Sequence, residues 1–259
     1  KDINLSIKKG NKTLIVGTSG CGKSTLFYVL VRLLYPLKGN IFIQGKNYDD
    51  LAEKSIREHF AVAFQEHHIF NLSIRDNFKM LYEDITDEEI YKSLENVYLL
   101  DFLKQVGLDY IVGNDGNKLS GGQKHRLQLA ICLAKQKDII LLDEPTAGLD
   151  PAGRDDILEQ IKFLHEKYNM TIIFVSHSME DVGKLAEKII VMNDGHIELQ
   201  GKPKEVFREI DTLERIGLAV PQVTYLMRAL KRKGFNVSED IFTVEKAKSE
   251  LLNILLKNK

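Results

Sequence analysis

Apolar and polar positions along this chain follow two patterns: short apolar runs, and longer stretches in which apolar residues have helical spacing. A short run bounded by Gly, Pro, Asn or Asp is typical of a strand. The opening segment, Ile3 to Ile7, alternates apolar and polar residues and also predicts a strand. Further strands are predicted at Thr13 to Gly17, Gly39 to Gln44, Phe60 to Phe64, Ile139 to Leu142 and Thr171 to Ser176, and at Ile189 to Met192 and His196 to Gln200, which flank a hairpin turn at Asn193-Asp194-Gly195.

Helical spacing fills most of the segments between these runs. Helices are predicted from about Lys23 to Leu34, Gly122 to Lys135, Ala152 to Tyr168 and Met179 to Glu187. Strands that alternate with helices indicate a mostly parallel sheet, so we expect an α/β fold.

The chain also contains two regions that are helical only. Between Ser73 and Val106 the pattern predicts helices, one of them with a capping box at Thr86-x-x-Glu89. We therefore expect a helical subdomain at about 66–135 within a domain of residues 1–200. After Gly201 the pattern is helical again, which predicts a small C-terminal domain at 201–259.

Composition excludes several classes of protein. Hydrophobic residues make up 44% of the 259 residues, charged residues 28%, and the formal net charge is −1. These values are ordinary for a globular protein, and the charge offers no positive field for nucleic acid. Two cysteines cannot form a disulfide framework, and a reducing, cytoplasmic setting is expected. The apolar runs are too short to span a bilayer, so any membrane part is expected in another chain.

A phosphate-binding loop follows the strand Thr13 to Gly17. Residues Gly17 to Ser24 fit the pattern G-x-x-x-x-G-K-[ST]. Glycines let the backbone curl so that N–H groups point at phosphate oxygens, and the following helix adds its positive end. We expect Lys23 to reach the β- and γ-phosphates, and the Ser24 hydroxyl to coordinate Mg²⁺. The alternative, a glycine turn that only joins strand to helix, does not account for the lysine and serine.

Two acidic residues, Asp143 and Glu144, end the strand Ile139 to Leu142. A carboxylate at this position can hold Mg²⁺ through water, which suits Asp143, and Glu144 could polarise an attacking water. Alone, the two acids could equally mark the start of a solvated loop. Beside a phosphate loop, the catalytic interpretation is favoured.

A third motif, Leu119-Ser120-Gly121-Gly122-Gln123, resembles the signature of ABC ATPases. Physically it is a second helix N-terminus with small residues, and hence a second anion site. The resemblance implies a phosphate-loop NTPase fold of the ABC type, and a head-to-tail dimer in which the signature of one subunit caps the ATP bound by the other.

Other positions match the family one by one. Gln65 resembles the Q-loop glutamine, Asp150 the D-loop aspartate and His177 the switch histidine. The resemblance implies catalytic roles for Glu144, His177 and Gln65, and Mg²⁺ coordination by Ser24, Gln65 and Asp143. The implied ATP-binding residues are Gly17, Ser19, Gly20, Cys21 (through its backbone only), Gly22, Lys23, Ser24, Thr25, Ser120, Gly121, Gly122, Gln123 and Asp150.

The two halves of the chain resemble different branches of the family. Residues 143–151 and 176–182 resemble importer-type ATPases. Residues 201–207, 216–218 and Pro221 are similar to the energy-coupling factor ATPases, which drive uptake of vitamins, cobalt or nickel. Residues 69–77 and 107–118 resemble exporters of peptides or lipids, which suggests a mosaic joined near Ile139. In the family an aromatic residue upstream of the first strand stacks on adenine. None precedes Ile3, and Tyr28 and Tyr35 are expected to be poor substitutes.

The leading hypothesis is therefore an ATPase subunit of an energy-coupling factor importer, peripheral to the cytoplasmic face of the membrane. Its implied partners are a second ATPase subunit, identical or different, and integral membrane subunits, without nucleic acid. The alternative is the nucleotide-binding domain of a peptide or lipid exporter. An ABC protein acting on ribosomes or DNA would need a second cassette or a long coiled coil. A catalytically dead subunit would not need Lys23, Asp143, Glu144 and His177.

Overall fold

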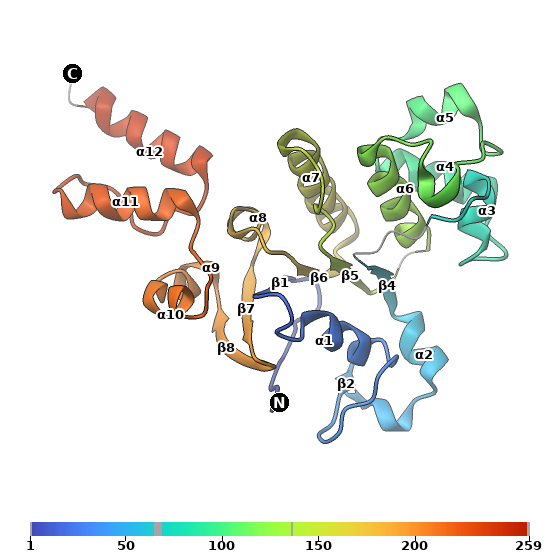
Figure 1. Ribbon diagram of the computed structural model, residues 1–259, viewed down its shortest axis with the longest axis horizontal. Helices are drawn as coiled ribbons and strands as arrows, with labels where there is room; N and C mark the ends of the chain where they lie inside the picture. The colour runs from blue at the N-terminus through green and yellow to red at the C-terminus, as the bar shows by residue number, and fades with distance from the viewer. Residues whose placement is uncertain (1, 65–68, 136, 258–259) are drawn as a thin grey trace. The chain divides into compact units, whose positions relative to one another are not determined.

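The computed structural model describes residues 2–64, 69–135 and 137–257, which fold into two compact units (Figure 1). The first unit consists of Lys1–Ile7, Asn11–Lys23 and Val175–Lys259, and the second of Lys8–Gly10 and Ser24–Phe174. The chain passes from the first unit to the second inside α1, because Lys23 belongs to the first unit and Ser24 to the second. Gln65 lies outside the described residues.

The second unit is built on three neighbouring strands in the order β4 (Phe60–Ala63), β5 (Ile139–Asp143) and β6 (Thr171–Val175). β4 and β5 are parallel, with Ala61 opposite Ile140 and Val62 opposite Leu141. Nearly every residue of β5 and β6 is buried, as expected for strands covered on both faces. This arrangement places Asp143 at the carboxyl end of a central buried strand.

Helices make up most of the remaining second unit. They are α1 (Lys23–Leu30), η1 (Tyr48–Asp50), α2 (Glu53–Glu58), α3 (Ile74–Lys79), α4 (Asp87–Asn96), α5 (Leu100–Val106), η2 (Asn114–Gly116), α6 (Gly121–Leu133) and α7 (Pro151–Tyr168), and a small hairpin is formed by β2 (Phe42–Ile43) and β3 (Lys46–Asn47). The helices α3 to α6 lie together in Figure 1, and α4 contacts α3, α5 and α6. A helical region thus follows β4, as the sequence predicts.

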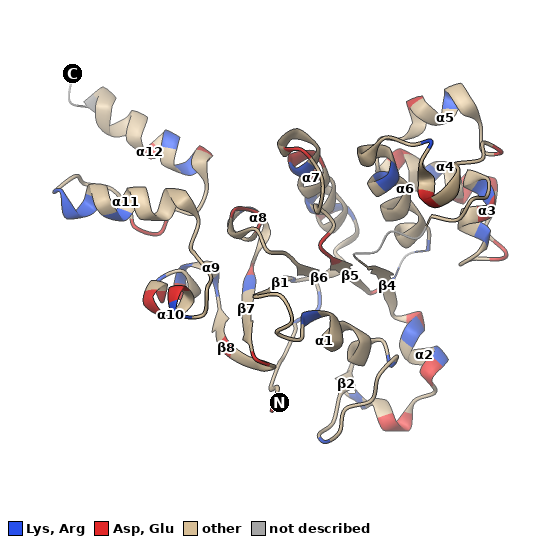
Figure 2. Cartoon of the chain, in the orientation of Figure 1, with Lys and Arg blue, Asp and Glu red and all other residues tan. Residues whose placement is uncertain are grey.

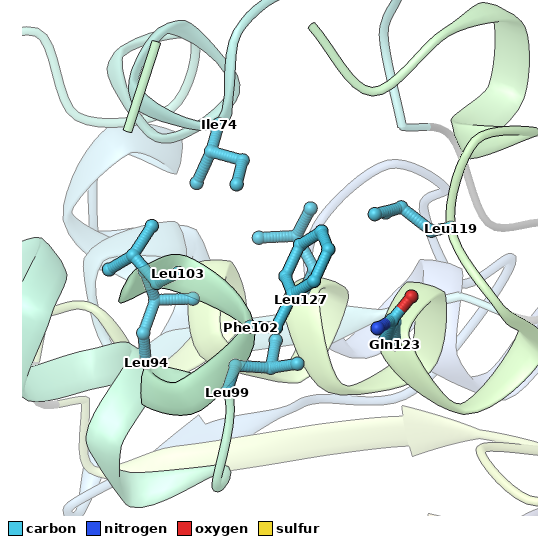
Figure 3. A pocket seen from close by; sticks show the side chains of 8 residues that line it. All are labelled: Ile74, Leu94, Leu99, Phe102, Leu103, Leu119, Gln123 and Leu127. Atoms are coloured by element: carbon cyan, nitrogen blue, oxygen red, sulfur yellow. The ribbon is translucent and has the colours of Figure 1, made fainter. Parts of the chain in front are cut away.

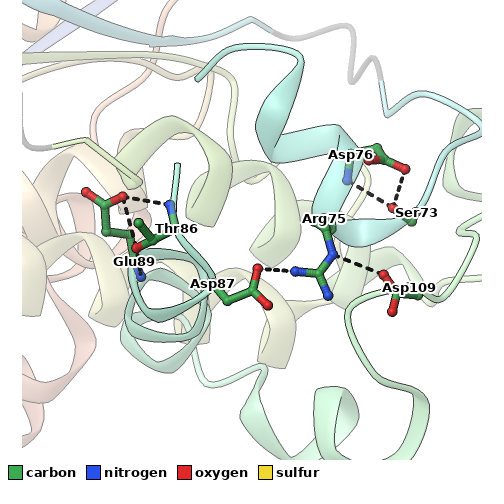
Figure 4. Close-up of polar contacts among 7 residues, drawn as sticks. All are labelled: Ser73, Arg75, Asp76, Thr86, Asp87, Glu89 and Asp109. Carbon is green, nitrogen blue, oxygen red and sulfur yellow. Dashed lines mark hydrogen bonds and ion pairs between the residues drawn. The ribbon is translucent and has the colours of Figure 1, made fainter. Parts of the chain in front are cut away.

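Polar contacts fix the start of this helical region (Figure 4). The Arg75 guanidinium lies between two carboxylates, pairing with Asp109 at 3.0 Å and with Asp87. The backbone of the same segment pairs with the loop before α6, where Ile74 N–H donates to the Tyr110 carbonyl at 3.0 Å. The predicted capping box of α4 is confirmed, because Glu89 N–H donates to Thr86 Oγ1 at 3.3 Å and the Thr86 N–H donates back to Glu89 at 2.9 Å.

The first unit contains the strand order β1 (Lys12–Gly17), β7 (Lys188–Asn193) and β8 (His196–Gly201). β1 and β7 are parallel, and β7 and β8 are antiparallel. The predicted hairpin turn is confirmed, with Asp194 and Gly195 both at positive φ (48° and 79°), as a two-residue turn of this type requires. The helices of this unit are α8 (Met179–Leu185), α9 (Pro203–Val206), α10 (Ile210–Arg215), α11 (Gln222–Arg232) and α12 (Val244–Lys257).

The last two helices share a small core of their own. α11 and α12 contact each other, and Met227, Val237, Ile241 and Ala247 are buried between and beside them. Val223 and Leu230 of α11 pack against this cluster, whereas Leu226 is 50% exposed. The apolar face of α11 therefore packs within its own C-terminal region, apart from Leu226.

Three sequence predictions are corrected. Residues 3–7 form no strand, since alternation marks a face that could be buried but does not supply a neighbouring strand. Of Gly39 to Gln44, only Phe42–Ile43 is a strand. α1 ends at Leu30 rather than Leu34, because Arg32 takes a left-handed conformation (φ 58°) and its guanidinium lies 4.4 Å from the centre of the Tyr35 ring.

Charged residues of both signs are interspersed over most elements, in keeping with the net charge of −1 (Figure 2). Among the described residues, none of the helices combines the length and the apolar character needed to cross a bilayer.

Candidate functional site

The phosphate loop connects β1 to α1. Gly20 and Gly22 have φ values of 78° and 104°, which curl the backbone as the sequence predicts. Lys23 is 7% exposed, and its Nζ donates to the carbonyl oxygens of Gly17 (2.9 Å) and Thr18 (3.0 Å). A buried ammonium with neutral oxygen partners retains a strong affinity for an anion. The loop and Lys23 therefore have the chemistry of a phosphate site.

Ser24, the next residue of α1, connects this loop to the acidic end of β5. Its hydroxyl donates to Oδ2 of Asp143 at 3.0 Å, and Asp143 is 4% exposed. Two oxygen donors this close form part of a site that suits a hard cation such as Mg²⁺. Of the three residues that the sequence assigned to Mg²⁺, Ser24 and Asp143 thus lie in contact, and the third, Gln65, lies outside the described residues.

Glu144 follows in a constrained turn. Its side chain is buried (6% exposed) and its φ of 53° lies in the left-handed region, which is uncommon for a residue other than glycine. The turn is closed by the Ala147 N–H, which donates to the Glu144 carbonyl at 2.9 Å. Backbone strain of this kind is found at functional sites, where the surrounding structure holds it in place. Glu144 is therefore held in a fixed position at the carboxyl end of β5.

A recess lies at this same edge of the second unit. Phe64 after β4, Asp143 of β5, and His125 and Gln128 of α6 contribute to its lining. Gln128 Nε2 also contacts the Phe64 carbonyl at 3.5 Å, directly before Gln65. Sequence reasoning missed Gln128, because nothing in the helical pattern indicates which exposed glutamine reaches a neighbouring strand.

The signature motif forms the N-terminus of α6. Ser120 caps the helix in a capping box, in which Gln123 N–H donates to Ser120 Oγ at 3.2 Å and Ser120 N–H donates to Gln123 Oε1 at 2.9 Å. The motif is exposed at Ser120 and Gly121. A Cβ atom added at Gly121 or Gly122 would meet nothing within 4 Å, and neither residue has a positive φ. The fold of this chain itself therefore does not require glycine at these two positions.

Leu119 and Gln123 also line a small apolar recess of the helical region (Figure 3). The remaining lining comes from α3, α4, α5 and α6, through Ile74, Leu94, Leu99, Phe102, Leu103 and Leu127. Packing in this region thus extends up to the signature motif.

Asp150 and His177 lie at or just before the starts of helices, and the other predicted residues lie in and around the phosphate loop and α1. Asp150 is exposed and caps α7, because its Oδ1 accepts the Gly153 N–H at 3.1 Å. His177 is exposed and follows Ser176, whose N–H donates to the Ile15 carbonyl at 3.4 Å. Thr25 and Ser19 are exposed, and Cys21 is buried. Tyr28 stacks on Phe64 with ring centres 5.4 Å apart, and Tyr35 hydrogen-bonds to Glu53.

Comparison with known proteins gives a consistent result. A family model described as "ABC transporter" matches residues 1–147. An energy-coupling factor transporter ATP-binding protein EcfA2 from Clostridium perfringens is 48% identical over 265 residues, covering 99% of this chain and 91% of that protein. The corresponding EcfA of Methanocaldococcus jannaschii is 36% identical over 261 residues, covering 98% and 91%.

A solved structure is also similar. The ATP-bound structure of a bacterial Atm1-family ABC exporter superimposes with a TM-score of 0.73 at 29% identity, over 81% of this chain. The matched part is 37% of the exporter chain. This agrees with the exporter resemblance of residues 69–77 and 107–118, while the relatives named above align over nearly the whole chain. The chain therefore belongs to the ABC transporter ATP-binding family, whose domains bind ATP and couple its hydrolysis to transport, and within it to the energy-coupling factor transporter ATP-binding proteins.

Proposed function

We propose that this chain is the ATP-hydrolysing subunit of an energy-coupling factor importer for vitamins or metal ions. The observation that carries the proposal is the 3.0 Å contact between Ser24 and Asp143, which joins the phosphate loop to the acidic strand end. The similarity to energy-coupling factor ATP-binding proteins over nearly the whole chain supports the importer assignment.

The proposed roles follow from the chemistry of each residue. Ser24 and Asp143 would hold Mg²⁺, with Gln65 as a further ligand. Lys23 would neutralise phosphate charge, and Glu144 would polarise the attacking water. Bound Mg²⁺ would supply positive charge to the phosphate oxygens. His177 would contact the γ-phosphate.

The signature would act on the ATP of a second subunit. Glycine has a lower helix propensity than alanine. Gly121 and Gly122 nevertheless occupy the first two positions of α6, without any crowding from their own chain that would require glycine. Close approach of a ligand to the backbone is a common reason for such glycines. An exposed helix N-terminus beside them suits the phosphate of a partner's ATP.

We infer the following organisation around this core. Residues 1–200 form the ATPase domain, with the helical subdomain at about 66–135, and residues 201–259 form a C-terminal domain that contributes to dimerisation. The partners are a second ABC ATPase subunit and integral membrane subunits. The protein acts at the cytoplasmic face of the membrane as a peripheral subunit.

A second candidate is the nucleotide-binding domain of an exporter. The similarity to the Atm1-family exporter favours it, as do the exporter-like residues 69–77 and 107–118. Reconstitution separates the two, because an importer subunit restores uptake when combined with energy-coupling factor membrane subunits, whereas an exporter domain does not.

The ATPase mechanism is tested with Glu144→Gln. We expect the parent protein to hydrolyse Mg·ATP and the variant to lose hydrolysis while retaining ATP. The variant should then form an ATP-locked dimer, which light scattering detects. Hydrolysis that persists in Glu144→Gln would remove Glu144 from its role. A parent that binds ATP but never dimerises would contradict the two-subunit arrangement.

A further inference from the structure

An ion pair joins the signature helix α6 to the helix α7. Arg126 Nη2 lies 2.7 Å from Asp156 Oδ2, and the two side chains are 24% and 56% exposed. Both residues belong to the second unit. Arg126 stands six positions after Ser120, the cap of α6, and Asp156 stands six positions after Asp150, the cap of α7. The pair therefore connects the two helices at positions that are equally far from their N-terminal caps.

The core holds only the later parts of these helices. The buried residues of α6 begin at Leu127, one position after Arg126. Those of α7 begin at Ile157, one position after Asp156. The first turns of both helices thus precede the fully buried residues, so polar contacts contribute to their orientation, in α6 beside the packing of Leu119 and Gln123. The Arg126–Asp156 pair is located directly before the buried part of each helix begins.

Two ion pairs at or near the ends of α6 lead elsewhere. Lys124 of α6 pairs with Asp115 of η2 at 2.7 Å, and Lys135, two residues after the end of α6, pairs with Glu89 of α4 at 2.6 Å. Both partners lie in the helical region that precedes α6. The Arg126–Asp156 ion pair, in contrast, links α6 to α7.

We infer that Arg126 and Asp156 are positioning residues that keep the signature Ser120–Gln123 and Asp150 at a fixed separation, so that both meet a second subunit together. The inference rests on the proposed ATP-sandwiched dimer. When the dimer closes, two helix starts that are already fixed relative to each other lose less conformational entropy than two helix starts that move independently. Neither residue is assigned contact with ATP, so both would act through the helix starts that they connect.

The test uses the full chain in the Glu144→Gln background with Mg·ATP. The variants are Arg126→Ala, Asp156→Ala and the exchange of both charges, Arg126→Asp with Asp156→Arg. Because the pair forms within each subunit, its loss weakens the dimer only through the extra ordering that the helix starts then need, so each single variant should weaken the dimer by about fivefold at most. The exchanged pair should restore most of that loss. ATP binding to the dilute monomer should not change, because the phosphate loop is intact.

Lys135→Ala is the matched control, since it breaks an ion pair just beyond the C-terminal end of α6. It should leave the dimer dissociation constant within twofold of the parent. Equal weakening by Lys135→Ala, or an exchanged pair no better than the single variants, would overturn the inference.

Hydrogen exchange of the monomer separates this inference from the proposed function. Arg126→Ala should speed exchange of the backbone amides at the starts of both α6 and α7. If Glu144→Gln fails to dimerise with ATP, the two-subunit arrangement is wrong, and faster exchange at both helix starts would still support the role of the pair in fixing them. Unchanged exchange at either helix start would overturn that role even if the dimer forms.

Discussion

At the scale of single residues, Gly17 is fixed by crowding. A Cβ atom at this position would lie 2.3 Å from the Met192 carbonyl oxygen and 2.6 Å from Cys21 Sγ. Since a backbone oxygen cannot move aside cheaply, we expect Gly17→Ala to destabilise the protein by about 2–3 kcal/mol. Urea unfolding measures the change. Gly121→Ala is the control, because its Cβ would meet nothing within 4 Å and alanine favours a helix, so this variant should be at least as stable as the parent. Equal stabilities of the two variants would contradict this account.

Ser24 provides a second residue-level prediction. Removing its hydroxyl in Ser24→Ala deletes one proposed Mg²⁺ ligand and the 3.0 Å hydrogen bond to Asp143. Loss of an oxygen ligand or its support typically weakens a metal site by about tenfold or more. We expect the affinity for Mg·ATP to fall by that factor, while the affinity for ATP in EDTA stays nearly constant. Calorimetric titration distinguishes the two, and an equal loss in both conditions would point to a folding defect instead.

At the scale of elements, Glu89 connects two helices of the second unit. It completes the capping box of α4 and pairs at 2.6 Å with Lys135, which lies two residues after the end of α6. The hydrogen bond from Lys135, followed by that from the Thr86 backbone, lowers the pKa of Glu89 below its usual 4.5. A carboxyl group with a lowered pKa in the folded state contributes stability that is fully present above pH 4.5 and is lost as the pH falls through the folded-state pKa.

We therefore expect Glu89→Gln to be less stable than the parent at pH 7, with a difference that shrinks steadily below about pH 4.5. Thermal melts from pH 3 to pH 7 measure this difference. Glu88→Gln, which changes the neighbouring exposed acid, should show a smaller pH dependence. A parent-to-variant difference that is constant over the pH range would contradict an ionised role for Glu89.

The elements also show how far the sequence could lead. Buried strands such as β5 and β6, the capping box at Thr86 and the turn at Asp194 were predictable, because each depends on local residue chemistry. The unpaired segment 3–7 and the early end of α1 were not, since a strand needs a neighbouring strand and the left-handed conformation of Arg32 is not indicated by its residue type. Local motifs likewise identified most of the candidate site. The Ser24–Asp143 contact follows from the motif chemistry, whereas the Arg126–Asp156 pair joins helices that no sequence pattern relates.

At the scale of the whole molecule, two different contacts are proposed to join subunits. The ATP sandwich depends on nucleotide, because the signature approaches the partner through its phosphate. The C-terminal contact does not. α11 and α12 bury Met227 and Ala247 in a shared cluster, yet Leu252, Leu255 and Leu256 of α12 are 46–68% exposed. Neighbouring exposed leucines on one helix favour association with another apolar surface.

We therefore expect the double variant Leu255→Gln with Leu256→Gln to weaken subunit association in the absence of nucleotide. Burying two leucines contributes on the order of 3 kcal/mol, so the dissociation constant should rise by roughly a hundredfold. Sedimentation of the nucleotide-free protein measures this, and the cluster around Met227 should keep the melting temperature close to that of the parent. Leu81→Gln is the control, because Leu81 is 66% exposed in the second unit and should leave association unchanged. If the α12 variant associates like the parent without nucleotide but dimerises less with ATP, the C-terminal helices act only within the ATP-bound dimer, and the division into two independent contacts is wrong.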